Sequence, residues 1–412
     1  MAAREAWIID TARTPRGIGK VGKGSLAHLH PQHLGATVLK ALRDRNDIDT
    51  SEIDDVVWGT SSQRGKQGAD LGRMSLLLAG YDTAASGVTL DRFCGSGITS
   101  VNMAAASIMS GMEDLVIGGG CEMMSFTSST AQGGGLLDAG NMALRELHPQ
   151  WHQGICADLI ATLEGVTRED VDKIGFESQR RAKIAMDEGR FDRSVVPVYN
   201  EDGSLALDHD EFPRPQTTME GLAQLPAVFE NFMPMPVDES GLTFDQLVKK
   251  VYPDVKINHM HHAGNSSGVV DGSGAVLLCS PEYAKARGWK PRAKIVAMAN
   301  AAGSPELMLN EPGPAARKVV KRAGMTLDDI DLFEINEAFA VVAFKFMRDL
   351  GLDPEKCNVN GGSIALGHPI GATGSILIGT VLDELERQDK STGLVTMCAA
   401  GGMAPAIIIE RI

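Results

Sequence analysis

The chain has 412 residues, of which 43% are hydrophobic and 22% are charged, and its formal net charge at pH 7 is -14. This composition is typical of an ordinary soluble globular protein with room for two or three packed units. The acidic balance argues against a nucleic-acid partner, because phosphate backbones are bound by basic faces. No apolar run is long and charge-free enough to predict a membrane span.

The two ends of the sequence carry no recognisable targeting signal. The first residues are charged and then strand-like, which predicts neither a secretory signal nor a transit peptide, and the last residues form no peroxisomal tripeptide. A cytoplasmic location is therefore expected. Six cysteines without CxxC spacing or a disulfide pattern predict free thiols and no cysteine metal site: Cys94, Cys121, Cys156, Cys279, Cys357 and Cys398.

Short β-rich runs alternate with helical patterns along the first third of the chain. Strands are predicted at 6–10, 54–59, 87–93 and 113–120, and helices at 33–45 and 96–111. This alternation is typical of an α/β fold with parallel strand pairing.

The same order of elements recurs near the C-terminus. Residues 293–301 resemble the first strand, and residues 313–338 repeat the pattern of 34–60, in which a basic helix leads through an acidic turn into a strand. The glycine-rich stretch 361–385 then matches the segment around Cys94. A duplicated α/β half explains this order, and two such halves can bring corresponding turns to one site.

The region from about 125 to 265 differs from both halves. It contains a helical pattern at 167–189, a hairpin signal at 201–203 and an irregular stretch rich in Pro and Met. Because it is neither of low complexity nor strongly charged, it predicts an inserted domain that covers the site rather than a linker.

Four short segments carry candidate chemistry. DRFCGSG places Cys94 at a strand-to-helix turn, where a nucleophile is exposed and the helix N-terminus favours its thiolate. INEAFA offers Asn336, GGSIALGHPIGATG offers His368, and MCAAGG offers Cys398. Each signal alone is weak, since a buried cysteine or histidine is commonly a packed core residue. Their positions at corresponding turns of the two halves favour a shared site.

The sequence resembles the thiolase family over nearly the whole chain. The similar segments, in the family's order, include GTSSQRGKQGADLGRM, the Cys94 segment, DEFPRPQTTMEGLAQLPAVF, AGNSSGVVDGSG, NEAFA and GGSIALGHPIGATG. The resemblance implies an α/β thiolase fold, with two duplicated βαβαβαββ halves in a five-layer αβαβα arrangement and an inserted loop domain. The implied boundaries are 1–124 with 268–291 for the N-terminal half, 125–267 for the loop domain and 292–412 for the C-terminal half.

The resemblance also implies catalytic roles. Cys94 would take the acyl group of a 3-ketoacyl-CoA and pass it to free coenzyme A, which suits thioester exchange between thiols. His368 would take the Cys94 proton, and Cys398 would protonate the departing acetyl-CoA enolate or remove that proton in the condensing direction. Asn336, through a water, and His368 would bind the thioester oxygen of acetyl-CoA. The backbone N–H groups of Cys94 and Ala400 would bind the acyl oxygen.

One residue of this set departs from the family. Many thiolases have glycine where this chain has Ala400, and a positive φ would cost an alanine more than a glycine. The oxyanion hole is nevertheless expected to survive, because alanine also has a backbone N–H.

Contacts with coenzyme A follow from the same resemblance. Arg214 matches a position at the nucleotide end, with a surface salt bridge as the alternative. Ser267 matches a serine near the pantetheine arm, and His152 matches a histidine at the pantetheine channel. Gln153 stands where short-chain enzymes often have methionine. Met308 matches an acyl-pocket methionine, with ordinary core packing as the alternative.

Residues 230–260 form the largest departure from the family, because the motifs on either side are expected to be much closer together. The density of Phe, Met, Leu and Val predicts an ordered insertion that reshapes the acyl or coenzyme A entrance. The HMHH run that ends it lacks a nearby cysteine or carboxylate pair, so surface or interface histidines are favoured over a metal site.

The expected function is reversible thiolytic cleavage of 3-ketoacyl-CoA to acetyl-CoA and a shortened acyl-CoA, with coenzyme A as substrate and neither metal nor cofactor. An acetoacetyl-CoA thiolase that condenses two acetyl-CoA is the main alternative. A decarboxylating ketosynthase is disfavoured by Cys398, and a non-catalytic acyl-CoA or lipid-binding relative by the presence of Cys94 and His368. A homodimer or tetramer is expected, and a β-oxidation complex partner stays open.

Overall fold

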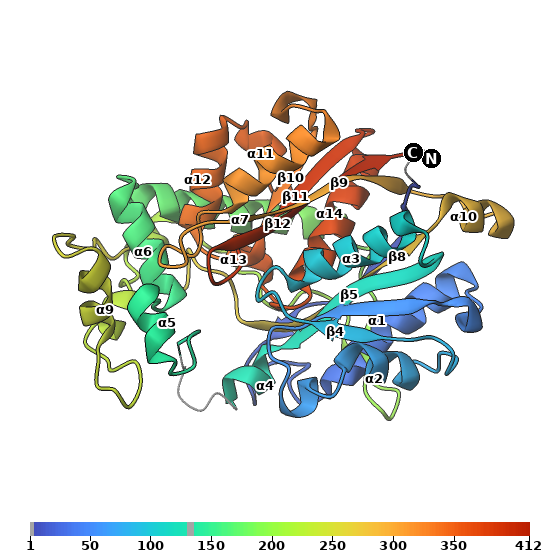
Figure 1. Cartoon of the computed structure of the whole chain (residues 1–412), viewed down its shortest axis with the longest axis horizontal. Helices are drawn as coiled ribbons and strands as arrows, with labels where there is room; N and C mark the ends of the chain where they lie inside the picture. The colour runs from blue at the N-terminus through green and yellow to red at the C-terminus, as the bar shows by residue number, and fades with distance from the viewer. Residues whose placement is uncertain (1–3, 130–135) are drawn as a thin grey trace.

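Two half-sheets with the same strand order form the centre of the molecule (Figure 1). The computed structural model describes residues 4–129 and 136–412. The first half-sheet has the order β4-β3-β5-β8-β1, and the second has the order β10-β11-β12-β9. The strands are β1 (Trp7–Arg13), β3 (Asp55–Gly59), β4 (Val88–Leu90), β5 (Leu115–Met123), β8 (Val270–Cys279), β9 (Ala293–Ala302), β10 (Leu332–Ile335), β11 (Thr392–Thr396) and β12 (Met403–Arg411), with the short β2 (Gly17–Ile18) beside β8.

The half-sheets also share their pattern of strand direction. β3 is parallel to β4 and β5, and β10 is parallel to β11, whereas β8 and β12 run antiparallel to their neighbours. A single parallel bridge between Phe333 and Cys357 takes the place that β4 has in the first half. The predicted duplication is therefore confirmed. The predicted parallel pairing is confirmed only for β3 with β4 and β5 and for β10 with β11, where the connecting segment crosses over so that the next strand runs in the same direction.

Helices cover the half-sheets in the five-layer αβαβα order. α3 (Ser96–Ser110) and α14 (Thr373–Arg387) contact each other and strands of both half-sheets, so they form the middle layer. α1 (Pro31–Asn46) and α2 (Leu71–Leu78) pack on the outside of the first half-sheet, and α11 (Pro312–Ala323) with α12 (Ala340–Leu350) on the outside of the second. β1 and β9 pair through Trp7 and Ile8, which joins the two half-sheets along one edge. The chain thus has the thiolase fold that its sequence predicts.

The regular structure of the region between the halves is mainly helical. Its elements are α4 (Met124–Ser129), α5 (Met142–Leu147), α6 (Gln153–Leu163), α7 (Arg168–Asp187), α8 (Met219–Ala223) and α9 (Phe244–Val251), with the hairpin β6 (Val198–Tyr199) and β7 (Leu205–Leu207). The predicted helix at 167–189 and the predicted hairpin are both confirmed. The remaining helices are α10 (Pro281–Arg287) and α13 (Ser363–Leu366). α6 and α7 pack against α12, so this region contacts the C-terminal half directly. The domain boundaries themselves stay a prediction.

The prediction of surface or interface histidines in the HMHH run is wrong for two of them, which are buried within the chain. His261 and His262 are buried, with Nδ1 of His261 2.7 Å from Asp158 and Nε2 of His262 2.8 Å from Asp172. These carboxylates come from α6 and α7, far away in sequence, which is why the run looked unpartnered. Across the described residues, no cluster of three His, Cys, Asp or Glu side chains is arranged to hold a metal ion.

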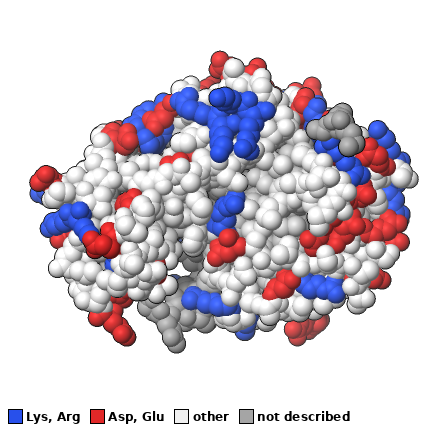
Figure 2. Space-filling model, in the orientation of Figure 1, with Lys and Arg blue, Asp and Glu red and all other residues white. Residues whose placement is uncertain are grey.

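Charge is unevenly distributed over the surface. Basic side chains gather over α11 on the face seen in Figure 2, and the exposed cations of this helix are Arg317, Lys318, Lys321 and Arg322. Lys318 and Arg322 donate to the backbone carbonyls of Asn300 and Met298 at the rim of β9. These cations thus satisfy exposed strand carbonyls. No helix of the described residues is long and apolar enough to cross a membrane.

A buried ion pair ties the first half to the region between the halves, and its removal is expected to destabilise the fold. Arg13 donates to both oxygens of Asp210 at 2.8 Å, and Asp210 also accepts the backbone N–H of Arg16 at 2.9 Å. Asp210→Ala should lower the free energy of unfolding by about 3–5 kcal/mol, because it leaves a buried guanidinium unpaired. Asp44→Ala, at the exposed Arg43 pair, should cost less than about 1 kcal/mol. Urea unfolding measures both.

The same pair gives an expected pH dependence. Burial alone would raise the pKa of Asp210, but the charges of Arg13 and Arg16 outweigh it and hold the pKa below its ordinary value. The stabilisation is therefore complete above the unfolded value of about 3.9 and is lost as the pH falls through the lower folded value. Equal losses from both variants, or a loss for Asp210→Ala that persists in strong acid, would contradict this role.

Candidate active site

Cys94 stands on a tight turn between β4 and α3. Phe93, directly before it, has a left-handed backbone with φ of 50°, which is uncommon for a bulky residue. The carboxylate of Asp91 accepts the Phe93 N–H at 2.6 Å, and the Ser96 hydroxyl donates to the Phe93 carbonyl at 2.7 Å. These bonds hold the strained turn, so the predicted sharp strand-to-helix turn at the cysteine is confirmed.

Cys94 and Cys398 meet where the two halves touch. Gly95 lies so close to the second half that a Cβ on it would be 3.3 Å from the Cβ of Ala399 and 2.9 Å from Pro405. Both cysteines are buried, and burial together with the neighbouring Cys94 raises the pKa of Cys398 well above its ordinary value. Two thiols from different halves therefore share one buried site.

His368 is held in one tautomer. Its Nδ1 lies 2.6 Å from the hydroxyl oxygen of Thr373, and that hydroxyl donates to the carbonyl of Pro369 at 3.0 Å. Because the only hydroxyl proton is used, Nδ1 must be the donor and Nε2 carries the free lone pair. Burial, with a contribution from the charge of Arg16, lowers the pKa of His368 to about 3. His368 is therefore a neutral imidazole that can accept a proton at Nε2.

Asn336 completes this group from the end of β10. Its Oδ1 accepts the hydroxyl of Ser363 at 2.5 Å, which leaves the amide nitrogen facing Nε2 of His368 at 3.4 Å. The amide donor is thus aimed at the same space as the imidazole lone pair. Ser363 was not found from the sequence, although it lies in the same glycine-rich segment as His368.

Cys94 is protonated at rest. Burial raises the pKa of its thiol to about 12, the nearby carboxylates Glu122 and Asp91 act in the same direction, and only its own backbone N–H opposes them. At the free site, burial therefore acts against the thiolate that the helix N-terminus favours. Cys94 and His368 are therefore both neutral at rest.

Glu122 is a positioning residue that sequence reasoning missed. Its carboxylate accepts the backbone N–H groups of Ser61 at 2.8 Å and Gly371 at 2.9 Å, and the side-chain amide of Gln67 at 2.6 Å. It therefore ties the end of β5 to the loop that carries His368. The only sequence signal is an acid within an otherwise apolar strand.

An apolar cavity of about 350 Å³ opens beside Cys94. His152, Met308 and Ala400 also line it, so the structure brings together four of the predicted residues on its wall. The wall includes eight further residues, of which only Gln153 was singled out in the sequence: Ser61, Phe93, Leu136, Leu137, Trp151, Gln153, Phe244 and Ile370. Most of these are ordinary apolar residues in loops, and nothing in their sequence context marks them.

The backbone at Ala400 is unstrained. Positive φ angles fall on the next two residues, Gly401 and Gly402, at 77° and 75°, and not on the alanine. In the described part of the chain, neither the Cys94 N–H nor the Ala400 N–H donates to a backbone carbonyl. The departure from glycine therefore leaves both N–H groups available to an oxygen atom.

His152 caps the start of α6, and its ring lies against Phe229 and Phe232 at centroid distances of 5.3 and 4.8 Å. Burial lowers its pKa, so it presents a neutral ring to the cavity. Met308 is buried with φ of 57°, a second strained backbone position on the cavity wall.

Ser267 and Arg214 lie outside the wall of this cavity. The Ser267 N–H donates to the carbonyl of Ala338, next to the Asn336 loop. Arg214 is exposed, with its guanidinium 5.7 Å from the ring of Phe212, and it makes no ion pair with any described residue. Within this chain the structure gives no support to the salt-bridge alternative for Arg214, and its contact with coenzyme A stays a prediction.

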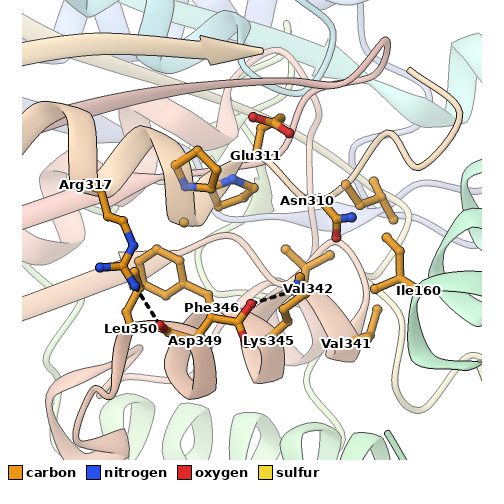
Figure 3. A pocket seen from close by; sticks show the side chains of 14 residues that line it. Ile160, Asn310, Glu311, Arg317, Val341, Val342, Lys345, Phe346, Asp349 and Leu350 are labelled. Carbon is orange, nitrogen blue, oxygen red and sulfur yellow. Dashed lines mark hydrogen bonds and ion pairs between the residues drawn. The ribbon is translucent and has the colours of Figure 1, made fainter. Parts of the chain in front are cut away.

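A separate pocket of about 370 Å³ lies between α11 and α12 and contains none of the predicted residues (Figure 3). Three of its charged residues are linked, since Lys345 pairs with Asp349 and Arg317 donates to the Asp349 carbonyl. The cavity at Cys94 is therefore the candidate active site.

The raised pKa predicts how Cys94 reacts. The rate of alkylation of Cys94 by iodoacetamide should rise about tenfold per pH unit from pH 7 to 9 without levelling, because thiolate is scarce below pH 12. Peptide mass spectrometry follows the reaction at Cys94 separately from the other five cysteines. A plateau near neutral pH would mean that a stabilised thiolate exists at rest.

Comparisons with known proteins agree with this geometry. The family model described as thiolase, N-terminal domain matches residues 6–232, and the one described as thiolase, C-terminal domain matches residues 289–411. A steroid 3-ketoacyl-CoA thiolase, FadA6, of Mycobacterium tuberculosis is 38% identical over 99% of this chain and 94% of its own length. A beta-ketoadipyl-CoA thiolase of Pseudomonas aeruginosa is 38% identical over the full length of both chains.

A solved structure shows the same likeness. The crystal structure of human mitochondrial 3-ketoacyl-CoA thiolase superposes with a TM-score of 0.84 at 31% identity, covering 99% of each chain. Family models that match both halves, and full-length relatives of this similarity, leave one assignment: this chain belongs to the thiolase family and is an acyltransferase.

Proposed function

We propose that this chain cleaves 3-ketoacyl-CoA by thiolysis, through an acyl group carried on Cys94. The observation that carries the proposal is a neutral Cys94 that lines an apolar cavity, with a neutral His368 on the turn before α14 and with Cys398 near enough for the Cys94 charge to raise its pKa. A thiol nucleophile suits this exchange, since the donor, the intermediate and the acceptor are all thioesters. Coenzyme A enters as a substrate, and the proposed reaction needs no metal or cofactor.

In the first half-reaction, Cys94 gives its proton to Nε2 of His368 as its sulfur attacks the 3-keto carbon. The unengaged N–H groups of Cys94 and Ala400 suit the oxygen that becomes negative there. The carbon–carbon bond then breaks, and Cys398 protonates the acetyl-CoA enolate, whose thioester oxygen is bound by Asn336 and His368. His368 then passes the proton that it took from Cys94 to the Cys398 thiolate, so both groups are neutral again before coenzyme A enters.

In the second half-reaction, the thiol of coenzyme A attacks the acyl group on Cys94. His368 takes the proton of the incoming thiol and returns a proton to the departing Cys94 sulfur, which restores the neutral pair. Because the resting site holds no ion pair, proton transfer has to accompany each attack. The reaction is reversible, and the direction used in the cell is a matter for experiment.

The alternative is an acetoacetyl-CoA thiolase that condenses two acetyl-CoA. It would use the same four residues, so the catalytic group does not separate the two functions. The size and apolar wall of the cavity favour the longer acyl groups of 3-ketoacyl-CoA degradation. Oligomeric state, a β-oxidation partner and a cytoplasmic location stay predictions.

The purified chain should cleave 3-ketooctanoyl-CoA when free coenzyme A is added, and Cys94→Ala should reduce this rate by at least about 10³-fold. Loss of absorbance of the 3-ketoacyl-CoA enolate measures the rate. Cys279→Ala, which removes a buried thiol of β8 away from the cavity, is the matched control and should keep activity. Full activity in Cys94→Ala would refute the proposal, and activity on acetoacetyl-CoA alone would favour the alternative.

Cys398 should be separable from Cys94 by isotope exchange. Cys398→Ala is expected to lose about 10²-fold or more of the exchange of acetyl-CoA methyl protons with deuterated water, because no base remains at that carbon. Acetyl transfer from acetyl-CoA to Cys94 should persist, since it does not involve that proton. Mass spectrometry detects both, and wild-type exchange rates in the variant would remove Cys398 from the mechanism.

A further inference from the structure

The insertion at 230–260 reaches the active-site cavity through Phe244. This residue opens α9, is only 8% exposed and lines the same cavity as Cys94. Thr243 caps the helix in a capping box with Gln246, which fixes where the helix begins and so where the ring points. The matched thiolase models end at 232 and resume at 289, so this ring belongs to the part of the chain that they do not describe.

Arg145 joins the two segments that form this side of the cavity. It is 2% exposed and donates to both oxygens of Asp138 at 2.8 Å and to Asp238 at 2.5 Å. Asp138 directly follows Leu136 and Leu137 of the cavity wall. Asp238 lies in the turn just before Phe244, where Val237 and Leu242 pair through their backbones. One guanidinium therefore fixes the distance between two parts of the wall.

The strength of this clamp comes from its burial. A bidentate, charge-assisted pair of this kind is specific in its geometry, and removing the arginine leaves the carboxylate of Asp138 buried and unpaired. A second pair, Lys250 with Glu146, links the same two segments at the exposed surface. The exposed pair contributes little to holding the two segments together, so a substitution of Lys250 is a matched control for a substitution of Arg145.

The chemistry of the wall decides which acyl groups fit. Leu136, Leu137, Trp151, Phe244 and Met308 present apolar surface, and none of the described residues that line the cavity is a lysine or an arginine. A carboxylate at the far end of an acyl group would lose its hydration there without gaining a counter-charge, which is costly. An uncharged hydrocarbon chain or ring system gains from the same burial.

We propose that Phe244 of the insertion forms a specificity wall of the acyl pocket, that Arg145 is the positioning residue that holds it, and that the pocket selects uncharged apolar acyl groups over acyl groups ending in a carboxylate. This inference rests on the proposed function, because it concerns the acyl group that Cys94 accepts. It separates the two classes of relative found above, whose names refer to a steroid 3-ketoacyl-CoA and to beta-ketoadipyl-CoA.

The test compares kcat/KM for thiolysis of three substrates: acetoacetyl-CoA, 3-ketooctanoyl-CoA and beta-ketoadipyl-CoA. The native chain should prefer 3-ketooctanoyl-CoA over beta-ketoadipyl-CoA at least about tenfold. Phe244→Ala should lower kcat/KM for 3-ketooctanoyl-CoA about tenfold more than for acetoacetyl-CoA, because only the longer group reaches the wall. Phe244→Arg should narrow or reverse the preference against the carboxylate by supplying a counter-charge.

Arg145→Met tests the clamp. It should raise KM for 3-ketooctanoyl-CoA about tenfold while kcat falls less than about threefold, since the wall is displaced but the catalytic group is untouched. Arg145→Lys, which keeps the positive charge but not the bidentate guanidinium geometry, should show a smaller rise in KM than Arg145→Met. Lys250→Ala should leave the ratio among the substrates unchanged. If Arg145→Met does not fold, the Phe244 variants decide the question.

The outcomes distinguish failure of the proposed thiolase function from failure of the proposed acyl selectivity. If the native chain cleaves none of the three substrates and Cys94 acquires no acyl group, the proposed function fails. If it cleaves them but prefers beta-ketoadipyl-CoA, the selectivity for uncharged groups is wrong. If the Phe244 variants change all substrates by the same factor, the specificity wall is wrong while the proposed function stands.

Discussion

The close approach of α3 and α14 at their N-termini is the constraint on which the site depends. A Cβ on Gly97 would come within 2.8 Å of the backbone nitrogen of Gly374, and one on Gly371 within 2.7 Å of the carbonyl of Gly59. Only residues without side chains permit this contact. Because the helices begin at this crossing, the turns before them, which carry Cys94 and His368, are brought to one place by the middle layer of the fold.

Burial then sets the protonation of what the crossing brings together. The thiol of Cys94 has a raised pKa and the imidazole of His368 a lowered one, so both groups are neutral although one stands at a helix N-terminus. Desolvation penalises charge on either group, whereas the helix dipole acts on one of them over a single turn. In such a site, Cys94 and His368 stay neutral until a polarised carbonyl carbon is present to accept the electron pair of the sulfur.

Much of this fold was predictable because its signals are local or repeated. The duplicated order of elements, the turn at Cys94 and the glycine-rich His368 segment are all visible within short windows of sequence. Contacts between distant segments were not predictable. Glu122 accepts a hydrogen bond from the Gly371 N–H, and Ser363 donates one that orients Asn336. The two buried histidines of the HMHH run bond to carboxylates about 100 and 90 residues earlier in the chain. Short windows of sequence also could not show that burial raises the pKa of Cys94, since burial is a property of the whole fold.

The structure also separates the parts that perform chemistry from the part that meets the acyl group. Cys94, Asn336, His368 and Cys398 stand on turns of the two halves, and short hydrogen bonds from Ser363 and to Thr373 fix Asn336 and His368. Phe244 reaches the cavity from an insertion whose buried anchor is Arg145, and none of the hydrogen bonds of Arg145 involves the catalytic group. Changes at sites without shared partners tend to be additive. A change in the insertion can therefore alter the shape of the pocket while the contact between the halves, and with it the protonation of Cys94 and His368, stays as it is.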